Sequence, residues 1–202
     1  LVGDRTARPT EDMISHLVLA RDDRDALSTD EIIGTCILLL FAGHETTTNL
    51  IGNGFLYSMK HREQWERLVA DPALAESAVE EFLRYDGPSG AMARVAAADI
   101  DMRGKTIREG QRVFAFMNSA NRDPEAFDDP ERFDIGRPQN PHMTFGHGIH
   151  FCLGAPLARL EAQIAAIRLA ERLPRIRLCS GEPEWHDSLI LRGVKALPVQ
   201  LS

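Results

Sequence analysis

The sequence is poor in cysteine, has no long apolar run and carries no excess of positive charge. Its three cysteines (Cys36, Cys152 and Cys179) are an odd number at wide spacing, which argues against a disulfide framework and favours a reducing cytosol. The longest apolar stretch, residues 32–43, is shorter than the roughly 20 residues of a membrane-spanning helix. The 23 Lys and Arg oppose 30 Asp and Glu, a net charge of −7, whereas nucleic-acid binders usually present a basic face. We therefore expect a cytoplasmic protein that binds neither nucleic acid nor membrane.

What is present is typical of a folded globular chain, with 44% hydrophobic and 26% charged residues. Apolar spacing and start and stop signals predict helices over residues 9–20, 29–59, 62–70, 73–85 and from about 153 onward. Runs compatible with β-strands occupy residues 94–102, 111–117, 175–179 and 188–201. Because helices and strands do not alternate regularly, we expect one mainly α domain with small β-sheets across residues 1–202.

Three local patterns add detail to this predicted set of helices and strands. Ser28 and Glu31 have the spacing of a capping box at the start of the long helix. Residues 21–25 form a polar connector before it, and residues 123–141, rich in Pro, Asp and Arg, are expected to be ordered coil. In the last helix the apolar positions predict a buried stripe, made of Leu157, Leu160, Ile164, Ile167 and Leu173.

A glycine-rich loop holds the middle cysteine. Residues 145–154 read Phe-Gly-His-Gly-Ile-His-Phe-Cys-Leu-Gly, just ahead of the last predicted helix. Gly146 and Gly148 permit backbone conformations that a β-carbon forbids, so the chain can pass close to a flat ligand. A cysteine beside a helix N-terminus favours the thiolate, which is a ligand of haem iron.

Two other interpretations of this cysteine exist. A lone cysteine in a glycine turn is commonly a buried structural residue. His147, His150 and Cys152 also have a spacing near that of zinc sites, although a fourth ligand is missing. The full ten-residue pattern favours haem over both.

A polar cluster interrupts the long predicted helix, where residues 42–46 read Ala-Gly-His-Glu-Thr. Thr46 is placed to bond back to the carbonyl of Ala42, which bends a helix and opens a groove. Gly43 would let a ligand approach the backbone. A polar stripe that faces solvent is the alternative interpretation.

Charged residues form a third pattern. Glu81 and Arg84 lie three apart in a predicted helix and can form an ion pair, which alone is common on protein surfaces. Two further arginines are Arg132, in Pro-Glu-Arg-Phe, and Arg94, after a Gly-Pro turn. Read alone, Arg94 would be taken for an exposed residue.

Together these motifs resemble the cytochrome P450 family, specifically its bacterial members. The loop fits the family pattern Phe-Gly-x-Gly-x-(Arg or His)-x-Cys-x-Gly at every fixed position, with His150 where most members carry Arg. The resemblance implies haem b as cofactor and Cys152 as the axial ligand of its iron. It also implies Phe145 packed beside the cysteine, and His150 and Arg94 as partners of the haem propionates. The residues that would pass close to the haem are Gly146, Gly148, Gly154, Ala42 and Gly43.

The same resemblance assigns roles to the other motifs. Glu45 and Thr46 match the acid–alcohol pair that delivers protons over the haem. Glu81, Arg84 and Arg132 match a buried structural charge network. Arg159, soon after the cysteine, is a candidate for the surface on which a ferredoxin docks. Substrate contacts would come from Leu38, Phe41, Ser89, Gly90, Ala91, Met92, Leu189 and Ile190.

The implied activity is that of a haem-thiolate monooxygenase, which inserts one oxygen atom from O2 into a small hydrophobic substrate. No flavin or nicotinamide fingerprint is present, so electrons would come from a separate ferredoxin and ferredoxin reductase. The resemblance covers the C-terminal half of the family's fold, so we expect a missing N-terminal half and poor haem binding by the chain alone. The alternatives are a peroxide-using peroxygenase of the same fold, which needs no proton relay, and a non-catalytic haem-binding fragment.

Overall fold

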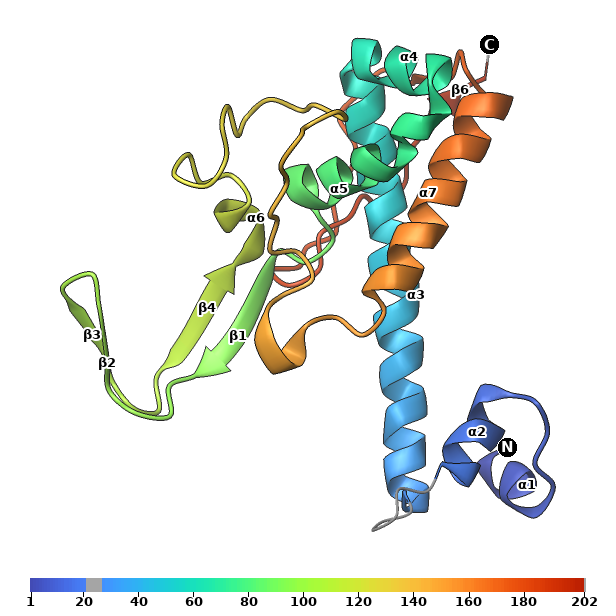
Figure 1. Ribbon diagram of the computed structural model, residues 1–202, viewed down its shortest axis with the longest axis vertical. Helices are drawn as coiled ribbons and strands as arrows, with labels where there is room; N and C mark the ends of the chain where they lie inside the picture. Colours follow the sequence, from blue (N-terminus) through green and yellow to red (C-terminus); the bar gives the residue numbers. More distant parts are fainter. Residues whose placement is uncertain (21–26, 202) are drawn as a thin grey trace. The chain divides into compact units, whose positions relative to one another are not determined.

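A computed structural model describes residues 1–20 and 27–201 (Figure 1). The chain divides into two compact units, Leu1–Glu45 and Thr46–Ser202. The helices are α1 (Val2–Ala7), α2 (Met13–Leu19), α3 (Thr29–Lys60), α4 (Arg62–Ala70), η1 (Pro72–Leu74), α5 (Ala75–Asp86), α6 (Met117–Ala120), η2 (Gly148–His150) and α7 (Ala155–Arg172). The strands are β1 (Ala91–Val95), β2 (Ile100–Met102), β3 (Lys105–Ile107), β4 (Arg112–Phe116), β5 (Arg177–Leu178) and β6 (Val199–Gln200). The connector predicted over residues 21–25 lies outside the described residues.

The first unit consists of α1, α2 and the N-terminal part of α3. The short helix predicted over residues 9–20 is present as α2. It begins after Asp12, whose carboxylate accepts from the backbone N–H of Ser15 at 2.8 Å, and α1, which ends before Pro9, was not predicted. The capping box is confirmed, because the Ser28 N–H donates to Glu31 Oε2 at 2.8 Å and the Glu31 N–H donates to Ser28 Oγ at 3.3 Å.

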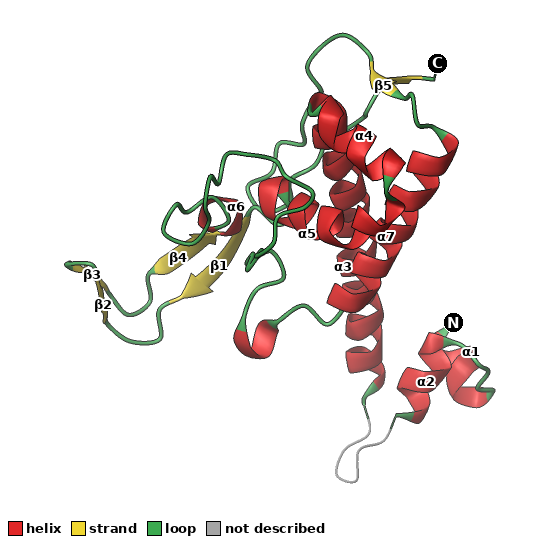
Figure 2. Ribbon diagram, turned by 45° about the horizontal axis from the view of Figure 1, so that its top comes forward, coloured by secondary structure: helices red, strands yellow, loops and turns green. Residues whose placement is uncertain are grey.

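The core of the second unit lies among α4, α5, α7 and the part of α3 after Thr46 (Figure 2). Aromatic side chains fill it. The ring of Phe55 meets Trp65 edge-on at 5.7 Å between centroids, and Phe82 stacks on Phe133 at 6.1 Å. Burial of each such side chain contributes about 1.5–3 kcal/mol, so this cluster fixes how the helices of the unit pack.

Helix α7 packs on α4 and α5 through alanines rather than through the leucine stripe predicted for it. The buried residues of α7 are Ala155, Ala162, Ala166 and Ala170, whereas Leu157, Leu160 and Ile164 are more than half exposed. Small side chains let neighbouring helix axes approach closely. Apolar spacing alone does not say which face meets which neighbour: Ile167 and Leu173 pack on this core, whereas Leu157, Leu160 and Ile164 lie outside it.

The strands form three two-stranded antiparallel sheets: β1 with β4, β2 with β3, and β5 with β6. The run predicted over residues 94–102 is broken into β1, which begins earlier at Ala91, and β2. The turn between β2 and β3 has positive φ at Arg103 and Gly104, 50° and 77°. The expected mainly α fold with small sheets is confirmed. Among the described helices, none combines the length and apolar character needed to cross a membrane.

Candidate functional site

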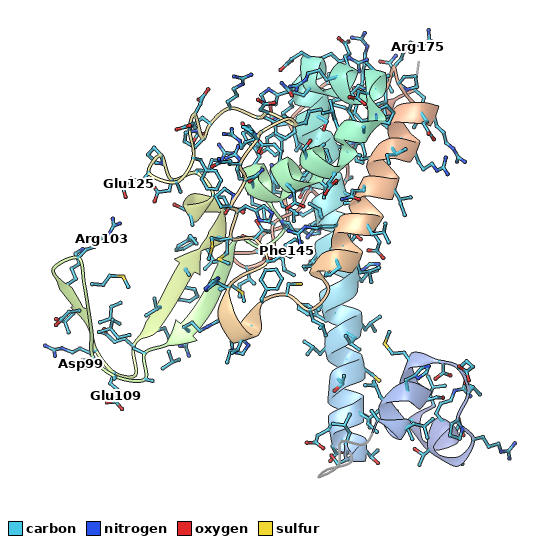
Figure 3. The ribbon with its side chains drawn as sticks, in the orientation of Figure 1. Asp99, Arg103, Glu109, Glu125, Phe145 and Arg175 are labelled. Atoms are coloured by element: carbon cyan, nitrogen blue, oxygen red, sulfur yellow. The ribbon has the colours of Figure 1, made fainter. Side chains whose placement is uncertain are left out.

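The loop before α7 is shaped by two left-handed glycines. Gly146 and Gly148 have φ of 76° and 72°, a region that residues with a side chain rarely adopt. The Cys152 N–H donates to the carbonyl of Phe145 at 2.9 Å, which closes the loop on itself. Figure 3 shows Phe145 in this loop, on the segment that leads into α7.

Cys152 is exposed at the outer side of this loop. Helix α7 begins three residues later, with Gly154 as N-cap and no side chain capping its free N–H groups. The neighbours of the cysteine are apolar and uncovered: Ile149 is 97% exposed, Phe151 51% and Leu153 90%. Exposed apolar residues gathered around a polar ligand atom are typical of a binding surface.

These features fit a haem. Within residues 1–20 and 27–201, no three His, Cys, Asp or Glu side chains gather to hold a metal ion, so the zinc alternative finds no ligand set there. A single thiolate suits an iron whose other ligands come from a macrocycle. A β-carbon at Gly148 would meet no atom within 4 Å, which leaves the backbone open to a flat ligand.

A charged cluster, made of Glu80, His142 and Arg159, packs near the Phe145 ring. Arg159 of α7 lies with its Cζ 4.6 Å from the centre of the Phe145 ring. Glu80 of α5 accepts from Arg159 Nε at 2.7 Å and from Nη2 at 2.9 Å, and His142 Nε2 lies 3.0 Å from the same carboxylate. Burial raises the pKa of Glu80, but the hydrogen bonds and charges of His142 and Arg159 outweigh it and bring the pKa to about 2. The Glu80 carboxylate therefore stays ionised across the physiological range.

This cluster gives Arg159, the candidate for the surface on which a ferredoxin docks, an acidic partner. Its guanidinium is not a free surface charge, because the packing of α5 on α7 brings Glu80 opposite it and the two form a bidentate pair. The sequence does not predict this pairing. Glu80 directly precedes Glu81, and it is Glu81 that has the spacing of an ion pair with Arg84.

The charge network around Glu81 also differs from the prediction in one member. Glu81 and Arg84 are fully buried and form two hydrogen bonds, at 2.7 and 2.8 Å. The Arg132 side chain is 61% exposed and lies near Asp134 instead; only its backbone carbonyl reaches Arg84. The second guanidinium comes from Arg137, whose Nε donates to Glu81 Oε2 at 3.2 Å. The coil turns back after Phe133, and this places Arg137 over the buried carboxylate.

Two of the expected substrate segments do lie together. The Gly90 N–H donates to the carbonyl of Ile190 at 2.8 Å, and a β-carbon at Gly90 would come within 2.9 Å of the Leu189 carbonyl. Ser89 is bridged to Leu191. Leu189 and Ile190 are about half exposed and Met92 is half-buried, whereas Ala91 is fully buried and presents no surface.

The turn at Leu189 is held by contacts that no pattern in the sequence predicts. Arg192 Nε donates to Asp86 Oδ1 at 2.6 Å, and its Cζ lies 3.9 Å from the Trp185 ring centre. The Tyr57 hydroxyl donates to Asp86 Oδ2 at 2.8 Å, and burial together with the Asp86 charge raises the pKa of Tyr57. These partners are far apart in the chain, so no local pattern reveals them.

The remaining predicted residues are placed as follows. Arg94 is exposed on β1 and donates from Nη1 to the carbonyl of Ala93, and His150 is exposed at the end of η2. Glu45 and Thr46 are half-buried and consecutive on α3, where the two compact units meet in the sequence. In the first unit, the exposed residues of α3 include Leu38, Phe41, Ala42 and Gly43.

The family model of cytochrome P450 matches residues 4–175. The biotin biosynthesis cytochrome P450 of Bacillus subtilis is 48% identical over 199 residues, which are 98% of this chain and 50% of that protein. The structure of the bacillaene polyketide synthase cytochrome P450 PksS of B. subtilis superposes with a TM-score of 0.96 at 44% identity, over 100% of this chain and 53% of that one.

A second solved structure is a cytochrome P450 in complex with an acyl carrier protein that carries hexadec-9Z-enoic acid. It has a TM-score of 0.94 and 46% identity, over 100% of this chain and 51% of that one. The chain thus spans about half the length of the relatives it matches. With the family model covering residues 4–175, the chain belongs to the cytochrome P450 family.

Proposed function

We propose that this chain is the haem-binding half of a haem-thiolate monooxygenase, which inserts one oxygen atom of O2 into a small hydrophobic substrate and reduces the other to water. The observation that supports this most is the exposed Cys152, in a loop shaped by two left-handed glycines. The apolar residues on both sides of that cysteine are uncovered as well.

Haem b bound at this loop would supply the redox chemistry that activates O2. Cys152, as thiolate, would hold the haem iron and donate electron density to it. The exposed Arg94 and His150 would pair with the propionates, for which a guanidinium and an imidazole N–H are suitable donors. The glycines at 146, 148 and 154, together with Ala42 and Gly43, would leave room for the ring.

Protons would move through the two neighbouring side chains of α3. The Thr46 hydroxyl would donate a hydrogen bond toward the reacting oxygen, and the Glu45 carboxyl would replace the proton that the hydroxyl gives up. Leu38, Phe41, Ser89, Gly90, Met92, Leu189 and Ile190 would hold the substrate and exclude water; Ala91 would support them from beneath.

Electrons would come from a separate ferredoxin and its reductase, and the rest of the pocket from a second half of similar size, as the length of the relatives indicates. Three observations support the fragment view. Leu157, Leu160 and Ile164 of α7 are exposed, the loop around Cys152 is uncovered, and the chain spans about half of each relative.

The test uses the full-length protein that contains this chain. After reduction, carbon monoxide should give the Soret band of a thiolate-ligated haem, and a Cys152→Ala variant should lose it. With ferredoxin, reductase and isotopically labelled O2, hydrophobic substrates including hexadec-9Z-enoic acid should give a product that contains one labelled oxygen. Equal turnover with hydrogen peroxide and no dependence on reductant would overturn the proposal in favour of a peroxygenase. No oxygen consumption by a protein with an intact thiolate band would favour a non-catalytic role.

A further inference from the structure

The charged cluster behind Phe145 links a carboxylate on α5 to the cysteine loop. Glu80 holds Arg159 through two hydrogen bonds, at 2.7 and 2.9 Å. Arg159 covers the Phe145 ring at 4.6 Å, and the carbonyl of Phe145 accepts the Cys152 N–H at 2.9 Å. Three consecutive contacts therefore connect Glu80 with the residue that carries the sulfur.

The cluster encloses Phe145 from more than one side. The His142 ring lies 5.8 Å from the Phe145 ring and its side chain is only 3% exposed, while its Nε2 contacts Glu80. Glu80 therefore fixes two of the groups that pack on Phe145. A carboxylate in this position restricts the rotamers of Arg159 and His142 together.

The cluster also places charge beside Phe145, the residue whose carbonyl accepts the Cys152 N–H. The hydrogen bond that Arg159 donates to Glu80 raises the pKa of Arg159, burial opposes this, and the negative charge of Glu80 adds to the increase. The side chains of Glu80 and Arg159 are 24% and 33% exposed, so solvent screens their charges only in part. A cation held there stabilises additional negative charge on the centre formed by the haem iron and the Cys152 thiolate.

We propose that Glu80 and Arg159 form a positioning pair that sets the reduction potential at the Cys152 ligand. The pair acts through the opposing charges that it holds behind Phe145. This inference rests on the proposed function, because it concerns the haem bound by Cys152. Neither residue touches the substrate or the haem in this proposal.

The two charges predict shifts of opposite sign. Reduction adds negative charge to the centre, so a nearby cation favours the ferrous form and a nearby anion disfavours it. Glu80→Gln leaves Arg159 uncompensated and should raise the ferric–ferrous midpoint potential. Arg159→Met leaves Glu80 uncompensated and should lower it. Each shift should approach a tenfold change in the equilibrium, which is about 59 mV for a one-electron couple.

The experiment is a spectroelectrochemical titration of the full-length protein. Arg159→Lys keeps the charge and should stay within about twofold of the wild-type equilibrium. The double variant Glu80→Gln/Arg159→Met restores the local net charge, and its potential should return close to wild type. The matched control is Glu171→Gln, because Glu171 forms an exposed pair with Arg168 on the same helix.

Each outcome decides a different claim. Potentials that move in the same direction in both single variants, or that do not return in the double variant, overturn the inference and leave a structural cluster. If the variants lose the thiolate band with carbon monoxide while Arg159→Lys retains both the band and the wild-type potential, the charge role stands. A wild-type protein without the band overturns the proposed function itself and this inference with it.

Discussion

Arg137 donates to the fully buried carboxylate of Glu81 over 3.2 Å, although 56 positions separate the two residues in the chain. The same guanidinium also donates to the carbonyls of Asp128, Asp129 and Arg132. One side chain thus ties the coil before the cysteine loop to helix α5.

This relationship predicts which arginine matters for stability. Arg137→Ala should lower the free energy of unfolding by about 3 kcal/mol, because it leaves a buried charge partly uncompensated. Arg132→Ala should change it by less than about 0.5 kcal/mol, because that side chain is largely exposed. Urea unfolding of the two variants gives the comparison. Equal losses, or a larger loss for Arg132→Ala, would contradict the assignment of Arg137 to the network.

The difference between these arginines shows what the sequence could and could not reveal. The Glu81–Arg84 pair is local to one helix, so its spacing predicts it. The third member depends on where the coil turns back after Phe133, and a linear pattern carries no information on that turn. The resemblance to the family directed attention to Arg132, which lies close by and contributes only its carbonyl.

The cysteine loop was predictable because, unlike the contact of Arg137 with Glu81, it is local in the sequence. Its shape depends on residues within ten positions of one another, and the left-handed φ values of Gly146 and Gly148 follow from their lack of a side chain. The partners of Phe145 were not predictable, because Glu80 comes from another helix. Helix α7 illustrates the same limit. Its length follows from its sequence, but leucines dominate its apolar pattern, so the pattern does not reveal that the alanines form the buried face.

The glycines of α3 provide a second stability prediction. A β-carbon at Gly54 would lie 2.3 Å from the buried Phe82 ring, so Gly54→Ala should destabilise the fold by about 1–3 kcal/mol through overpacking. Gly52→Ala is the control, since its β-carbon would meet only Val194 at 3.7 Å. That variant should be stabilised by about 0.4–1 kcal/mol because alanine restricts the unfolded chain. Thermal unfolding compares them, and a Gly54→Ala protein as stable as Gly52→Ala would show that α3 and α5 are not packed this closely.

The proposed proton path predicts a specific loss in the Thr46→Ala variant of the full-length enzyme. Reductant and O2 should still be consumed, but product formed per reductant should fall about tenfold or more, since a hydroxyl that donates protons is gone. Thr47→Ala, the next threonine on the same helix, is the control and should stay coupled. Product yield is measured against reductant consumed. Full coupling in Thr46→Ala would remove Thr46 from the path.

The last prediction concerns acid stability and Glu80. Its folded pKa of about 2 lies below the ordinary value of 4.5, because hydrogen bonds from His142 and Arg159 outweigh the effect of burial. A lowered carboxyl pKa stabilises the fold fully above the unfolded pKa, and the contribution is lost as the pH falls toward the folded pKa. The difference in unfolding free energy between wild type and Glu80→Gln should therefore be constant from about pH 7 to pH 5 and shrink steadily below about pH 4.5. Urea unfolding at several pH values measures it, with the exposed Glu171→Gln as reference. A difference that stays constant down to about pH 3 would mean that Glu80 gains nothing from its two partners, because its pKa would then be the same in the folded and the unfolded chain.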